Sequence, residues 1–303
     1  YYPANDNPLY MVGLVPAQFD DVTTSTEQEG WKMAADSLTA SYVIDGKTDI
    51  MAAAVTTMNN GTDAIQKSKA SATVYPAFNF KHKLTLVNIK AYTPTQKEQA
   101  AWGKITKIEL IAVNGVAAGV NNLCTVTLKD AVAGVSGAAA NVVVPFYHCA
   151  LNGATPAVLT YDDLKISNQD DKDADTDGVL YGPVEIPAPA SATATAFESK
   201  DAKYVAYSMI APFQAISHAT RANLTLKVYT EQHEKGIDTK IMTLYDSALT
   251  YDASGNVTNT DEYTGSTEGK KFDVTLKFIG KEIIAAASVT DWEEKYVEDV
   301  VIQ

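Results

Sequence analysis

The chain has 303 residues, of which 46% are hydrophobic and 20% charged, a composition typical of a globular protein with room for about two domains. Its formal net charge of −13 argues against binding to nucleic acid or to an anionic membrane surface, because both require clustered Lys and Arg. No apolar run approaches the roughly 20 residues of a spanning helix, and no secretion signal opens the chain.

The first part of the chain has the pattern of short strands separated by turns. Strands are expected at 42–44 and 50–55, on either side of a turn at Asp45–Gly46. Residues 77–92 are expected to form one long strand. Its apolar face changes phase midway, which predicts a β-bulge near Leu86–Val87.

One short helix interrupts this series. It is predicted over 94–101, where Gln, Glu and Ala are frequent and where Thr93 or Thr95 is a suitable N-cap. Further strands are expected at 105–113, 124–128 and 142–146.

A second series of strands follows a less regular stretch. Residues 168–178 form an acidic loop and 183–195 an extended Pro- and Ala-rich segment. Strands are then expected at 204–210, 222–229 and 240–245.

A hairpin near the C-terminus has the clearest pattern. In its first strand Phe272, Val274, Leu276 and Phe278 alternate with polar residues, which predicts one buried and one solvated face. The chain turns at 279–282 and returns as an apolar strand over 283–289. The two strand series predict an all-β fold of two tandem β-sandwich domains with few short helices, covering 1–153 and 154–303.

Three alternating carboxylates in the acidic loop suggest a calcium site. Asp173, Asp175 and Asp177 precede Gly178, as in the first half of a calcium-binding loop. The match then fails, because position twelve is Val184 and not Glu. The alternatives are a structural calcium site and a solvated acidic loop, and no other cofactor is indicated.

The remaining reactive residues favour structural roles. His82 lies on the apolar face of its strand, which indicates a core histidine bonded to backbone. Cys124 and Cys149 are compatible with one disulfide or with two separate thiols. No nucleophile elbow or phosphate-binding loop occurs. The sequence therefore predicts that the protein is not an enzyme.

Several segments together resemble the fimbrillin superfamily, the subunits of Bacteroidia-type (type V) pili. They are DGKTDIMAA at 45–53, FKHKL at 80–84, WGKI at 102–105 with IEL at 108–110, MIAP at 209–212 and GKKF at 269–272 with the closing Asp291–Trp292. Their order spans 45–292. The resemblance implies transthyretin-like, Greek-key sandwiches, a structural or adhesive role without catalysis, and an outer-membrane lipoprotein displayed in a fimbrium.

The resemblance also implies how such subunits assemble. A sandwich that lacks a strand exposes an apolar groove, which a strand of the neighbouring subunit fills. Family members have more sequence before the segment that matches 1–16, so we expect the first domain to lack its first strand or strands. The family's Arg-directed maturation site is expected upstream of Tyr1, because the chain has no arginine before Arg221. The lipid anchor that the resemblance implies is expected upstream of Tyr1 as well.

The C-terminal segment is a candidate donor strand. The octapeptide YVEDVVIQ at 296–303 spans roughly 26 Å when extended, about one sandwich edge. Its apolar residues are Tyr296, Val297, Val300, Val301 and Ile302. It either inserts into a neighbouring subunit or pairs within its own chain, and shaft, tip and anchor roles stay open.

Two other functions are consistent with a displayed β-protein. A monomeric surface lipoprotein that binds glycans or another host ligand would expose an aromatic platform, for which Trp31 and Tyr42 are candidates. A β-sandwich hydrolase would need paired carboxylates in a cleft, of which the sequence gives no sign. Expected partners are thus other pilin subunits and host proteins or glycans.

Overall fold

The computed structural model describes residues 5–17, 30–34, 39–44, 46, 48–113, 116–117, 123–127, 132–135, 147–148, 179–212, 223–242, 267–292 and 295–296. These residues form an all-β structure with one short α-helix, as the sequence predicts. No helix among them is long and apolar enough to cross a membrane.

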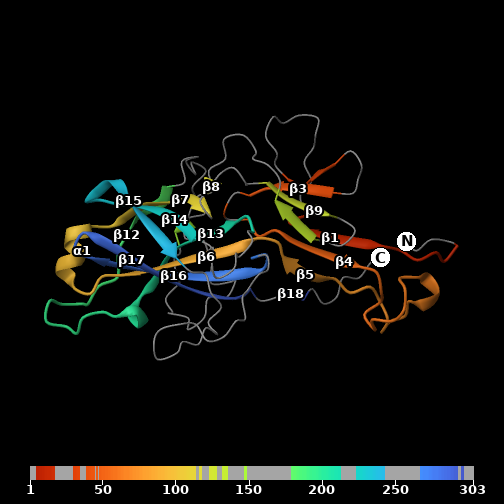
Figure 1. Cartoon of the computed structure of the whole chain (residues 1–303). Coiled ribbons are helices and arrows are strands. Elements are labelled where there is room, and N and C mark those ends of the chain that lie inside the picture. The colour runs from red at the N-terminus through yellow and green to blue at the C-terminus, as the bar shows by residue number, and fades with distance from the viewer. Residues whose placement is uncertain are drawn as a thin grey trace, which may run out of the picture.

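The described strands form four sheets. The first sheet has the order β1-β4-β5-β18, with β1 at Met11–Val15, β4 at Met51–Val55, β5 at Asn79–His82 and β18 at Lys295–Tyr296. The second has the order β10-β9-β3-β2, with β10 at Val132–Val135, β9 at Leu123–Thr127, β3 at Thr39–Val43 and β2 at Lys32–Met33. We call these two sheets the first sheet pair, since they lie at the same end of the molecule (Figure 1).

The third and fourth sheets form the second sheet pair. The third has the order β11-β13-β6-β16-β17, with β11 at Tyr147–His148, β13 at Lys203–Ile210, β6 at Thr85–Tyr92, β16 at Lys270–Ile279 and β17 at Glu282–Asp291. The fourth has the order β12-β7-β14-β15, with β12 at Val179–Val184, β7 at Ile105–Val113, β14 at Asn223–Thr230 and β15 at His233–Met242. The short strand β8 at Val116–Ala117 also pairs with β7. The helix α1, Gln96–Trp102, connects β6 to β7. Figure 1 shows the two pairs at opposite ends of the molecule.

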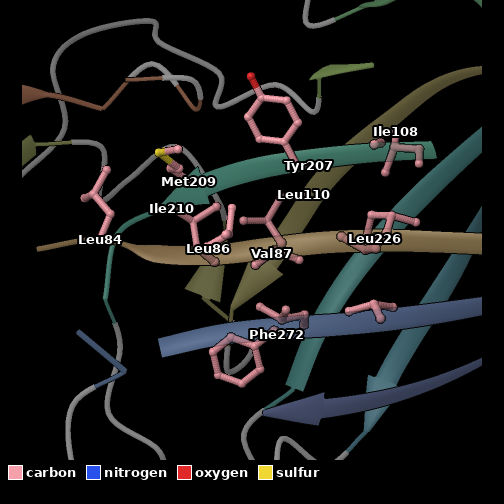
Figure 2. Close-up of a cluster of buried hydrophobic side chains, with 14 of the residues drawn as sticks. Leu84, Leu86, Val87, Ile108, Leu110, Tyr207, Met209, Ile210, Leu226 and Phe272 are labelled. Carbon is pink, nitrogen blue, oxygen red and sulfur yellow. The ribbon is translucent and has the colours of Figure 1, made fainter. Parts of the chain in front are cut away.

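Apolar side chains of the second sheet pair fill most of the core. Leu226 and Ile108 of the fourth sheet lie in the same cluster as Val87 and Phe272 of the third, and all four are almost fully buried (Figure 2). The alternation predicted for β16 is confirmed, since Phe272, Val274, Leu276 and Phe278 are buried and the residues between them are half-buried. The hairpin turns at Gly280, whose φ of 55° favours glycine.

The helix was also predicted correctly. Thr95 is the N-cap, and its side chain accepts a hydrogen bond from the backbone N–H of Glu98. Trp102 ends the helix and is fully buried. Gly103 follows with a φ of 70°.

The long strand predicted over 77–92 is in fact two strands in different sheets. β5 ends at His82 in the first sheet, and β6 begins at Thr85 in the third. The predicted bulge near Leu86–Val87 is wrong, because β6 pairs regularly with β16 through both residues. The change of phase in the sequence marks the passage of the chain from one sheet pair to the other.

Strands on either side of residue 153, the predicted domain boundary, pair with each other. β6 and β7 precede this residue, yet they pair with β13, β16, β12 and β14, all of which follow it. Conversely, β18 returns to the first sheet. The two sheet pairs are therefore interleaved in the sequence, while the existence of two independent domains stays a prediction.

Candidate assembly site

The first candidate site is one side of the first sheet pair, where the terminal strand of one sheet lies near the terminal strand of the other. β1 ends the first sheet and β2 ends the second. The indole Nε1–H of Trp31, next to β2, donates a 2.9 Å hydrogen bond to the carbonyl of Pro16, next to β1. The two terminal strands thus lie on the same side, which we call the open side. Among the described strands, none pairs with the outer edge of either.

The strand β1 is apolar but incompletely covered. Its sequence is MVGLV, and all five residues are half-buried, whereas four of the five residues of its neighbour β4 are buried. Leu14 packs against the main core, and Met11 packs against a small cluster around Met58 and Ile65. Tyr10 and Met33, which flank the open side, are 43% and 40% exposed. An apolar edge with open backbone groups can accept a further strand.

Glycine is required near the middle of β1. A Cβ atom on Gly13 would lie 2.5 Å from the ring of Phe80, and the rings of Phe78 and Phe80 stack with centroids 5.8 Å apart. The two rings therefore pack directly over the backbone of the edge strand.

The candidate donor segment begins at the opposite edge of the same sheet. Tyr296 is opposite Asn79, and Lys295 is opposite Phe80, in an antiparallel pair of β18 with β5. Tyr296 is thus paired within its own chain, although with the first sheet and not with the nearby hairpin. The other candidates, Val297, Val300, Val301 and Ile302, lie outside the described residues.

The second candidate site is the junction where the chain passes between the sheet pairs. His82 is 3% exposed, and its Nδ1 lies 2.9 Å from Oδ1 of Asp49. Its ring stacks on Trp292 with centroids 3.7 Å apart and planes 3° from parallel. The next residue, Lys83, forms a 2.7 Å ion pair with Glu268.

Backbone hydrogen bonds close the same junction. The N–H of Lys83 donates to the carbonyl of Ile50, and the N–H of Gly269 donates to the carbonyl of Leu84. The N–H of Trp292 in turn donates to the carbonyl of Gly269. The junction therefore brings together three segments that carry the family resemblance, namely 45–53, 80–84 and 269–292. The junction fixes one sheet pair against the other.

The predicted core position of His82 is confirmed, and the ring partner that the structure shows is the Asp49 carboxylate, where a backbone group was expected. Burial keeps both His82 and Asp49 away from a substrate, and stacking on Trp292 gives the imidazole a packing role. Asp49 was not recognised as its partner. The available signal was an acidic residue directly before the apolar strand 50–55.

The aromatic platform expected around Trp31 and Tyr42 is not exposed. Trp31 is 1% exposed and packs edge-on against Tyr42, with ring centroids 5.2 Å apart. The indole that would have stacked on a sugar ring therefore belongs to the core, and this prediction is wrong.

The other predicted residues divide between described and undescribed parts of the chain. Cys124 is a buried free thiol, and burial raises its pKa to about 12. Cys149 and the calcium candidates Asp173, Asp175 and Asp177 lie outside the described residues. Within the described part of the chain, no group of His, Cys, Asp and Glu is arranged to hold a metal ion.

Comparison with known proteins found similar solved structures. No family model and no curated protein matches the chain. Similar solved structures include a candidate cell adhesion protein from Bacteroides uniformis, with 10% identity, a TM-score of 0.45 and coverage of 97% of this chain and 76% of that one. A fimbrial protein from Bacteroides vulgatus has 12% identity and a TM-score of 0.41, with coverage of 96% and 80%.

A third similar structure is the tip fimbrial protein Mfa3 from Porphyromonas gingivalis, with 12% identity, a TM-score of 0.27 and coverage of 70% of this chain and 52% of that one. At such low identities and TM-scores, the likeness does not say what this chain does.

Proposed function

We propose that this chain is a structural or adhesive subunit of a cell-surface pilus that assembles by strand exchange. The observation that carries the proposal is the open side. There the half-buried apolar strand β1 is the terminal strand of the first sheet and lies near β2, the terminal strand of the second sheet. Added strands bind such edges through main-chain hydrogen bonds and through side chains in alternate pockets. The resemblance of the sequence to fimbrillins supports the same function.

The donor in this proposal is the end of the chain after Tyr296. Because β18 pairs with β5 at the far edge of the first sheet, we assign the donor strand to 297–303. Seven extended residues span roughly 23 Å, which is enough to line the whole of β1. The pilus would be displayed at the outer membrane, with other pilin subunits as the partners and a lipid anchor upstream of Tyr1.

The acceptor role can be tested at the edge strand. Val12 lies in β1 directly opposite Ala54 of β4, so the two side chains share a face of the sheet. A lysine on an edge strand opposes the addition of another strand. We expect Val12→Lys to reduce polymer yield roughly tenfold, measured by electron microscopy and size-exclusion chromatography of the assembled protein.

Ala54→Lys is the matched control, since it places the same charge on the same face but one strand away from the edge. Ala54 is exposed, so this variant should fold and assemble normally. Equal yields from the two variants would contradict the acceptor role. Deletion of 298–303 tests the donor separately: unchanged polymers would exclude the tail as donor and leave the open side to another strand.

A further inference from the structure

Two long strands end the second sheet pair on the same side, but only one of them is protected from pairing. β15 ends the fourth sheet and β17 the third, and the two strands contact each other. β15 includes Glu234, Lys235, Asp238 and Lys240, and its ladder is irregular near Gly236, which has a φ of 71°. Charges and bulges of this kind prevent a further strand from pairing with an edge.

The strand β17 has neither the charged residues nor the irregular pairing of β15. Its sequence is EIIAAASVTD, without a charge between Glu282 and Asp291. It pairs with β16 over all ten residues without an irregularity. Ile284 is 51% exposed and Ala286 is also exposed, while Ile283, Ala285 and Ala287 pack against the core. The result is a regular strand without a charge between its end residues, and no other described strand pairs with its outer edge.

We propose that β17 pairs antiparallel with β17 of a second copy of this chain, on a two-fold axis through Ala286. The third sheets of the two copies would then form one continuous sheet. This contact uses a different sheet from the open side, so it is independent of the proposed strand exchange.

The charges at the two ends of β17 favour a second copy as the partner. With the axis at Ala286, Lys281, in the turn directly before β17, comes level with Asp291 of the second copy, and the symmetry repeats this pair at the other end. Asp291 already pairs with Lys270 of its own chain, and its side chain is 82% exposed. It would therefore lie between two lysines. A shift of the axis by one residue would instead place Asp291 opposite Ile279 or Ile283, and this charge pair would be lost.

Sedimentation velocity over a range of concentrations tests the pairing. Ala286→Asp places two short carboxylates opposite each other on the axis, whereas Ala286→Asn has the same shape without charge. We expect the wild-type chain and Ala286→Asn to dimerise, and Ala286→Asp to dimerise about tenfold or more weakly. A wild-type chain that stays monomeric, or equal association of the two variants, would overturn the proposal.

Disulfide trapping gives a second readout that does not depend on weakening the contact. Directly opposed residues of antiparallel strands have Cα atoms about 4.5–5.5 Å apart, which is within the range of a disulfide. Ala286→Cys should therefore form a covalent dimer under mild oxidation. Ala100→Cys, on an exposed position of α1, is the control. Adding Val12→Lys to the Ala286→Cys variant should leave the yield of trapped dimer unchanged. If Ala286→Cys forms no more covalent dimer than Ala100→Cys, the proposed axis is refuted.

Discussion

Cys124 combines complete burial with a strongly raised pKa. The residue lies in β9 within the main core, and loss of solvent raises its pKa to about 12, with the nearby Glu268 carboxylate acting in the same direction. Since the thiolate is the reactive form, its population near pH 8 is roughly a thousandfold lower than that of an ordinary thiol. Burial of the sulfur also hinders any reagent.

We therefore expect Cys124 to resist alkylation in the folded protein. The variant Cys149→Ser leaves it as the only thiol. Labelling followed by mass spectrometry should be slow in native buffer and rapid in denaturant. Rapid labelling of the native variant would contradict the burial of this residue.

Residue roles were predictable from sequence where they depended on local pattern. The apolar neighbours of His82 identified it as a core residue. Its contacts with Asp49 and Trp292 could not be predicted, because these residues are distant in the sequence and meet only through the packing of separate strands. The same limit explains the error at Trp31, whose polar sequence surroundings gave no sign of burial.

Gly103, directly after α1, is a position where a side chain would be costly. Its φ of 70° is unfavourable for other residues, and a Cβ atom there would lie 2.9 Å from Cβ of Glu231. Glu231 is held in place, since its carboxylate accepts a hydrogen bond from the backbone N–H of Lys104.

We expect Gly103→Ala to lower the free energy of unfolding by about 2–4 kcal/mol, from backbone strain and from the shift of Glu231. Gly61→Ala is the control, because Gly61 has a similar φ of 72° but no atom within 4 Å of the added Cβ. It should cost only about 1–2 kcal/mol. Urea unfolding of both variants measures the difference, and equal losses would show that the contact with Glu231 is unimportant.

At the level of elements, alternation and capping residues predicted the strands and the helix correctly, but they did not predict where the strands end. The β16–β17 hairpin and α1 follow directly from period-two alternation and from Thr95. The break between β5 and β6 was missed because Lys83 and Leu84 continue the alternation of polar and apolar residues. Both residues are buried at the junction, so their burial does not distinguish a strand from a crossing between sheets.

For the whole molecule, the junction couples the two sheet pairs. One core cluster includes residues of both pairs, and Trp292 stacks on His82 where they meet. We therefore expect a single cooperative unfolding transition by calorimetry. Trp292→Ala should cost about 3–5 kcal/mol and separate the transition into two.

Trp292→Phe is the control, since a smaller aromatic ring can still stack on the imidazole. It should be less destabilised and should keep one transition. Two transitions in the wild-type chain would show that the pairs unfold independently, in support of two domains. The sequence predicted two series of strands but could not predict their pairing, because alternation is a local property.

The parallel pairing of β6 with β16 has a consequence for how the chain folds. β6 lies in the centre of the third sheet between β13 and β16, although about 180 residues separate it from β16 in the sequence. Contacts over such distances form slowly, because a long loop must close first. During synthesis β6 leaves the ribosome well before β13 and β16 exist, so the third sheet can be completed only after the β16–β17 hairpin has emerged. Until then the central strand of this sheet lacks one of its two neighbours, and its open edge needs protection from pairing with other chains.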